Sequence, residues 1–169
     1  ENPALKSRIA SIPDELYSFL SASTRDMMGF YRQFYPRFDG KRYEALREAF
    51  PAVNEKQAIR RLSKGMQKQA FFWLSLCCRP DVLVLDEPVD GLDPVMRRQV
   101  WSLLMGDVAD CGTTVLVSSH NLRELEDVCD HVGILSHGKV LIQRSLSDLQ
   151  GNVVKMQVVF QEREAPELP

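Results

Sequence analysis

Four consecutive apolar residues occupy positions 82–85, directly before two acidic residues and a proline. The segment is Val-Leu-Val-Leu-Asp-Glu-Pro. A short apolar run rich in β-branched residues predicts a strand that is buried on both faces, as in a parallel sheet. Acids at the carboxyl end of such a strand lie where α/β sheets bind ligands, so Asp86 and Glu87 are candidate functional residues. Helix capping is the alternative, and it explains Asp93 before Pro94 better than it explains the acidic pair.

The rest of the chain alternates between strand-like and helix-like spacing. Strands are expected at residues 8–12, 113–119, 131–135, 139–143 and 153–160. Helices are expected at residues 23–35, 41–49, 55–60, 66–78, 94–109, 121–129 and 145–149. The inward positions of the helix at 94–109 are expected to be Val95, Val100, Leu103 and Leu104. Because strands and helices alternate after residue 80, we expect a mainly parallel sheet.

Residues 15–80 have a helical pattern and are rich in methionine and aromatic residues. We expect most of these side chains to form a small helical core. An exposed aromatic surface that contacts a partner is the alternative.

Composition narrows the functional classes. The 169 residues carry a net charge of −2, so no basic excess indicates a nucleic-acid partner. The longest apolar run, at 71–78, is too short to span a bilayer, and no signal peptide is expected at the start of the chain. No C-x-x-C pair is present and three of the four cysteines lie in apolar patterns, so buried, reduced thiols of a cytosolic protein are expected. The cysteines are Cys77, Cys78, Cys111 and Cys129.

Two further groups are candidates for ligand binding. His120 follows the expected strand at 113–119, and the carboxyl ends of neighbouring parallel strands meet at one edge of a sheet. We therefore expect His120 to lie near the acidic pair, although a surface or capping histidine is the alternative. Ser63 and Gly65 stand at the start of an apolar helix. They could form an ordinary cap, or present a hydroxyl and backbone N–H groups to an anion.

Together these features resemble the ATP-binding subunits of ABC transporters. The segment Leu-Ser-Lys-Gly-Met at 62–66 is similar to the signature motif of that family, with Lys64 and Met66 in place of the usual Gly and Gln. Residues 82–87 resemble the Walker B strand, and residues 90–93 resemble the D-loop. His120 resembles the switch histidine. The Lys-Gly-Met variant and the stretch after His120 are most similar to bacterial subunits that pair with ABC-2-type membrane permeases.

The resemblance implies a fold and a division of the chain. The implied fold is α/β, a partial P-loop NTPase (RecA-like) domain with a mainly parallel sheet and an inserted α-helical subdomain. Residues 1–14 would be a Q-loop strand, and residues 15–80 the helical subdomain with the signature motif. Residues 81–160 would form half of the catalytic core, with the Walker B strand, D-loop and switch histidine. Residues 161–169 would be a tail.

The resemblance also implies roles for single residues, with ATP and Mg²⁺ as cofactors. Asp86 would hold Mg²⁺, Glu87 would act as general base on the attacking water, and His120 would stabilise the γ-phosphate. Contacts to nucleotide would come from Ser63, Lys64, Gly65, Met66, Asp93 and Asp14. Some of these contacts would cross to a second nucleotide-binding subunit in a head-to-tail dimer.

Two departures from the family pattern affect activity. Asp14 stands at the place of the Q-loop glutamine, and a carboxylate cannot donate a hydrogen bond as an amide does. The phosphate-binding loop G-x-x-x-x-G-K-[ST] does not occur in the 169 residues. A near match at 133–140 ends in valine and joins two expected strands, so we interpret it as a hairpin. We therefore expect the chain to be the carboxyl-terminal part of a nucleotide-binding domain, and to be inactive alone.

The expected parent function is an ATP-hydrolysing subunit that couples hydrolysis to transport. It would lie in the cytoplasm at the inner face of the cell membrane and contact an integral permease through the helical subdomain, without nucleic acid. A soluble ATPase of the same superfamily acting on ribosomes or DNA is one alternative, which the near-neutral charge disfavours. A non-hydrolysing regulatory subunit is another, suggested by Asp14 and Lys64 but disfavoured by Glu87 and His120. The sequence does not indicate the transported substrate.

Overall fold

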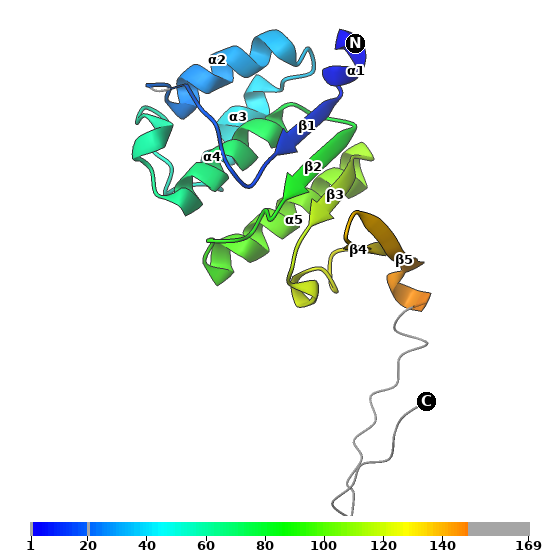
Figure 1. Cartoon of the computed structure of the whole chain (residues 1–169). Helices are drawn as coiled ribbons and strands as arrows, with labels where there is room; N and C mark the ends of the chain where they lie inside the picture. The colour runs from blue at the N-terminus through cyan, green and yellow to red at the C-terminus, as the bar shows by residue number, and fades with distance from the viewer. Residues whose placement is uncertain (1, 20, 149–169) are drawn as a thin grey trace, which may run out of the picture. The chain divides into compact units, whose positions relative to one another are not determined.

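A three-stranded parallel sheet forms the centre of the first of two compact units (Figure 1). The computed structural model describes residues 2–19 and 21–148, and the two units comprise residues 1–124 and 125–169. The strands are β1 (Ile9–Ile12), β2 (Val82–Asp86) and β3 (Thr114–Ser118), in the order β1-β2-β3. The expected α/β fold with a parallel sheet is confirmed. The predicted acidic strand is thus the central one.

Helices cover one face of this sheet. Helix α4 (Lys64–Cys77) packs against β1, helix α5 (Pro94–Cys111) packs against β3, and the two helices contact each other. Leu83 and Leu85 point to this face and are buried. Side chains of the opposite face are less covered: Val82 and Val84 are half-buried, and Leu116 is 63% exposed. The prediction of a strand buried on both faces is therefore wrong for the second face, because no described element of the first unit covers it.

The helical region between β1 and β2 contains α2 (Thr24–Phe34), α3 (Gly40–Leu46) and α4. Trp73 of α4 is fully buried, stacks on the ring of Tyr43 at a centroid separation of 4.6 Å, and donates its indole N–H to the Tyr43 carbonyl at 2.8 Å. Phe50 and Phe72 are also fully buried. A helical core is therefore present, as expected. A short helix α1 (Pro3–Lys6), which was not predicted, precedes β1.

Three predictions about helices are wrong. The helix expected at 55–60 is reduced to a 3₁₀ turn η1 (Ile59–Arg61), because Ala58 pairs with Ser23 in a β-bridge and Ile59 donates its N–H to the Ala22 carbonyl. The helix expected at 121–129 is reduced to η2 (Leu122–Glu124), after which the boundary between the units falls. On α5, Val95 is 64% exposed, since Met96, one helical turn before the buried Val100, takes the inward position.

The described part of the second unit contains an antiparallel hairpin. Strands β4 (His131–Ser136) and β5 (Lys139–Ser145) are joined by a turn in which His137 and Gly138 have positive φ angles of 47° and 74°. The near match to a phosphate-binding loop lies in this hairpin, as predicted. The strand expected at 153–160 and the tail at 161–169 lie outside the described residues, as does the end of the helix expected at 145–149.

Cys77 and Cys78 are buried and Cys129 is half-buried, but Cys111 is exposed at the end of α5, where the guanidinium of Arg79 donates to its sulfur at 3.0 Å. The expectation of buried thiols is therefore wrong for Cys111. Within the described ranges, no helix combines the length and the apolar character that crossing a membrane requires.

Candidate functional site at the carboxyl edge of the sheet

The carboxyl ends of β2 and β3 bring Asp86 and Ser118 together. The two residues are register partners, and the Ser118 hydroxyl donates a hydrogen bond to Asp86 Oδ1. The next residue, Glu87, donates its backbone N–H to the Ser118 carbonyl at 3.2 Å. Parallel pairing thus continues one residue past the strand and sets the direction in which the acidic pair leaves the sheet.

Glu87 and His120 form a direct contact at this edge. Glu87 Oε1 accepts the backbone N–H of His120 at 3.0 Å and lies 2.9 Å from Nδ1 of its ring. The hydrogen bond to Glu87, followed by the negative charge of Glu87, raises the pKa of His120 above its ordinary value. The His120 side chain is 78% exposed. The structure therefore brings the predicted acid and histidine together and leaves the imidazole open to solvent.

The backbone of Glu87 is strained. Its φ is +44°, in the left-handed region that non-glycine residues rarely adopt. A non-glycine residue in this conformation lowers the stability of the fold by about 1–3 kcal/mol, and the conformation persists only where surrounding contacts hold it. Its N–H is bonded to Ser118 and its carboxylate to His120, and its carbonyl accepts from the ammonium group of Lys68 at 2.7 Å and from the Asp90 N–H at 3.3 Å. Strain of this kind clusters at functional sites.

Lys68 is a site residue that the sequence analysis missed. It lies on α4, is 6% exposed, and places Nζ 3.2 Å from Asp14 Oδ1 as well as 2.7 Å from the Glu87 carbonyl. One signal could have indicated it: Lys68 lies one helical turn before the fully buried Phe72, so the two share a face of α4. Through Lys68, Asp14 is joined to the acidic turn after β2.

A second missed group ties the segment after His120 to α5. Arg97 donates from Nη1 to Glu124 Oε1 at 2.6 Å and from Nε to the Leu92 carbonyl at 2.8 Å. The Asn121 amide donates to the same Glu124 oxygen at 3.0 Å. These bonds hold the backbone on both sides of the site against the start of α5.

The signature-like segment forms the start of α4. The Ser63 hydroxyl accepts the Met66 N–H at 3.3 Å, so Ser63 caps the helix. Gly65 lies against the D-loop-like turn, because a Cβ atom at this position would stand 2.9 Å from the Gly91 carbonyl oxygen. Ser63 and Lys64 are exposed, whereas Gly65 and Met66 are half-buried.

Asp93 is the N-cap of α5. Its Oδ1 accepts the N–H groups of Val95 at 3.0 Å and Met96 at 3.1 Å, which matches the capping interpretation. Within the described ranges, no hydrogen bond or ion pair joins Ser63, Lys64 or Asp93 to Asp86, Glu87 or His120. The predicted site residues therefore form two groups: the edge of the sheet, with Asp14 joined to it through Lys68, and the helix starts beside it.

The oxygen donors at the sheet edge suit a magnesium ion. Asp86 is exposed and Ser118 adds a hydroxyl beside it. Mg²⁺ is commonly bound by one or two carboxylates, with waters and substrate phosphates completing its shell. Among the described residues, no group of three or more His, Cys, Asp or Glu side chains could hold a metal by itself. Asp86 and Ser118 offer oxygen donors of the kind that Mg²⁺ takes.

Comparison with known proteins decides the family. A family model described as "AAA domain, putative AbiEii toxin, Type IV TA system" matches residues 2–126. The ABC transporter ATP-binding protein YtrB of Bacillus subtilis is 30% identical over 160 residues, which cover 95% of this chain and 54% of YtrB. The chain belongs to the ABC transporter ATP-binding proteins. Another member is the daunorubicin/doxorubicin resistance ATP-binding protein DrrA of Streptomyces peucetius, 34% identical over 95 residues, or 56% of this chain and 28% of DrrA.

Solved structures of ABC proteins share the fold. An ATP-binding subunit of an ABC transporter superposes with a TM-score of 0.79 at 23% identity, covering 88% of this chain and 63% of the other. CbiO1 from Clostridium perfringens is part of the ABC transporter complex cbiONQ. It superposes with a TM-score of 0.64 at 23% identity, and the match covers 88% of this chain and 61% of CbiO1. Some curated relatives match most of the residues of this chain. The chain spans about half the length of those relatives.

Proposed function

We propose that this chain carries the Walker B, D-loop and switch-histidine part of the ATP-hydrolysing subunit of an ABC transporter. The observation that carries the proposal is the Glu87–His120 contact beside Asp86, at the edge where α/β sheets bind ligands. The membership of the chain in the ABC family supports it.

Glu87 acts as the general base in this proposal. Both of its contacts with His120 use Oε1, so we assign its second oxygen to the attacking water. His120 stabilises charge on the γ-phosphate. Because Nδ1 faces Glu87, the other ring nitrogen is available to the phosphate, and a raised pKa favours the protonated ring in which that nitrogen donates.

Asp86 would hold Mg²⁺ together with the phosphates of ATP. When bound, the ion would neutralise charge that develops on the phosphate oxygens. Ser63 to Met66 and Asp93 remain assigned to a nucleotide shared with a second subunit in a head-to-tail dimer. Exposure of Ser63 and Lys64 at the start of α4 is compatible with such a contact.

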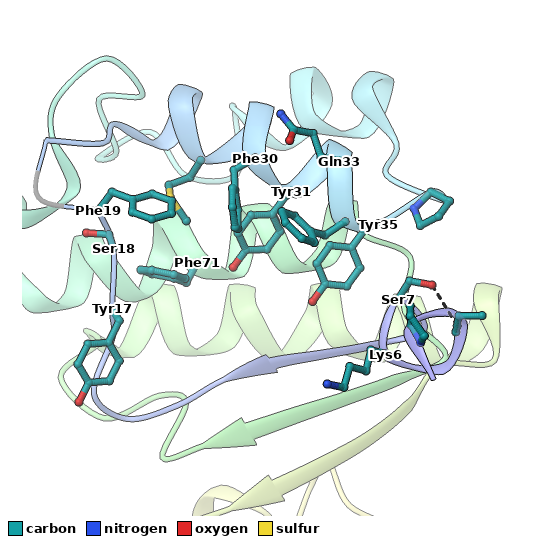
Figure 2. Close-up of a pocket in the computed structure, with 15 residues that line it drawn as sticks. Lys6, Ser7, Tyr17, Ser18, Phe19, Phe30, Tyr31, Gln33, Tyr35 and Phe71 are labelled. Carbon is teal, nitrogen blue, oxygen red and sulfur yellow. Dashed lines mark hydrogen bonds between the residues drawn. The ribbon is translucent and has the colours of Figure 1, made fainter. Parts of the chain in front are cut away.

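An aromatic groove supports a membrane permease as the partner. Residues after β1 and residues of α2 border a cavity of about 970 Å³, into which Phe19, Phe30 and Phe71 project (Figure 2). Tyr17, Phe19 and Phe34 are more than half exposed. Apolar patches of this kind mark interaction sites. We assign the groove to a segment of an integral permease, so the subunit would lie at the cytoplasmic face of the cell membrane.

The proposal is tested by ATP hydrolysis. The 169-residue chain is expected to show no measurable ATPase, because it contains no phosphate-binding loop motif. In a longer chain that joins these residues to such a loop, Glu87→Gln should lower kcat by about 10²–10⁴-fold, the usual contribution of a general base. Glu126→Gln makes the same change at an exposed position outside the site and is the matched control.

The outcomes of hydrolysis and copurification experiments distinguish the proposed function from the alternatives. Hydrolysis that survives Glu87→Gln would overturn the assigned base. No hydrolysis in the unaltered longer chain would favour the non-hydrolysing regulatory subunit. Copurification of the longer chain with a membrane permease supports the transport role, whereas copurification with ribosomes would favour the soluble ATPase.

A further inference from the structure

We infer that Lys68 is a positioning residue for Glu87: its buried ammonium group holds the Glu87 carbonyl and so maintains the strained turn that directs the Glu87 carboxylate to His120. The contacts of Lys68 are given by the structure, whereas their relevance to hydrolysis rests on the proposed function.

Burial of the Lys68 charge needs an explanation. An ammonium group is costly to remove from water unless it is paired and hydrogen-bonded. Lys68 is 6% exposed, and a methionine of similar length could fill its place without that cost. Two oxygens account for the charge: the Glu87 carbonyl at 2.7 Å and the Asp14 carboxylate at 3.2 Å. These two oxygen atoms therefore explain why a charged side chain is buried at this position.

The Glu87 carbonyl is the point at which this hold acts. With φ at +44°, the residue gains stability by rotating back to negative φ unless its peptide groups are fixed on both sides. Ser118 fixes the N–H side. On the carbonyl side, the Asp90 N–H is a longer contact at 3.3 Å, so the charged and shorter bond from Lys68 is the stronger one.

Asp14 completes the arrangement. Its carboxylate is 54% exposed, and it supplies the negative charge that pairs with the Lys68 ammonium. The glutamine that the resemblance implies at this position is neutral, and its amide could not offset the buried charge. The departure at Asp14 is thus explained by Lys68: the two residues form one unit that joins the segment after β1 to the turn after β2.

Amide hydrogen exchange in the 169-residue chain tests the inference. Lys68→Met should raise exchange of the Glu87 and His120 N–H groups by about tenfold, because the strained turn opens more readily once its carbonyl is no longer held. Amides of Leu83 and Leu85 in β2 should keep their protection. Lys68→Arg, which retains a charged donor, should restore much of the protection at Glu87 and His120.

Other results of the exchange experiment would have different meanings. A uniform rise at all amides would mean that Lys68 only stabilises the fold. Unchanged exchange at Glu87 and His120 in a folded Lys68→Met chain would overturn the inference. If that variant does not fold, Asp14→Asn serves instead, because Asp14 is exposed: a smaller rise confined to the same two amides supports the inference, and no rise contradicts it.

Hydrolysis separates this inference from the proposed function. In a longer chain with a phosphate-binding loop, Lys68→Met should lower kcat while KM changes little. If Glu87→Gln leaves hydrolysis intact, the role of Glu87 as general base in the proposed function fails, while the exchange result still decides whether Lys68 positions Glu87.

Discussion

At the scale of single residues, the site depends on how one carboxylate is shared. Glu87 Oε1 receives both the backbone N–H and the ring nitrogen of His120, while the Glu87 carbonyl faces Lys68. The contacts with His120 fix the side chain of Glu87, and the contact with Lys68 fixes its backbone. Glu87 is therefore oriented by its neighbours despite a backbone conformation that a glutamate on its own would leave.

The charge of Glu87 should be visible in the titration of His120. Glu87→Gln removes the negative charge, so the His120 pKa should fall toward its ordinary value of about 6.5. Because the folded pKa is raised, the pair stabilises the fold fully below the unfolded pKa, and this contribution is lost as pH rises through the folded pKa. NMR titration of the His120 ring measures the shift. Glu126→Gln should leave it unchanged, and equal His120 pKa values in the two variants would contradict the assigned contact.

At the scale of elements, the start of α4 and the turn before α5 are packed backbone to backbone. Gly65 approaches the Gly91 carbonyl so closely that a Cβ atom has no room, and Gly91 itself has a φ of +74°. The same helix carries Lys68 one turn later and Trp73 in the core. Helix α4 thus joins the helical core, the D-loop-like turn and the acidic turn.

Two glycine substitutions should change stability in opposite directions. Gly65→Ala should destabilise the fold by about 1–3 kcal/mol, as overpacking does, since backbone atoms must move. Gly29→Ala lies inside α2 with open space around it and should stabilise the fold by about 0.5–1 kcal/mol. Urea denaturation measures both. Equal effects of the two changes would show that the contact with Gly91 does not constrain Gly65.

At the scale of the whole molecule, apolar surface remains exposed in each unit. On the sheet, Leu116 and Ile9 are exposed, and β1 and β3 are the outer strands of the described sheet. On the hairpin, Leu135, Val140 and Leu141 are more than half exposed. Exposed sheet edges and apolar faces promote association between chains.

The 169-residue chain should therefore self-associate as its concentration rises. Leu116→Lys combined with Leu141→Lys should reduce the association, because it removes apolar surface and adds like charges. Thr114→Lys adds a charge beside Leu116 without removing apolar surface, and should have a smaller effect. Light scattering over a concentration series measures the mass. A monomer at all concentrations in the unaltered chain would contradict this prediction.

The sequence by itself determined the elements whose patterns are local. The run at 82–86, the alternation after residue 80 and the cap at Asp93 each indicate their structure within a few residues. The meeting of Glu87 with His120 was also predictable, because neighbouring parallel strands end at the same edge. The shortened helices at 55–60 and 121–129 were not, since the first gives way to a pairing with residues more than 30 positions away.

Only the tertiary structure decided which distant groups meet. Lys68 contacts Asp14 and Glu87, which are 54 and 19 positions away in sequence, and helical spacing alone does not say where on a crossing helix an ammonium group ends. The covered face of the sheet and the aromatic groove likewise depend on how α2, α4 and α5 pack. The periodicity of a segment indicates which of its side chains are buried. Contacts between segments depend on how the segments cross, and the pattern of a single segment does not contain that information.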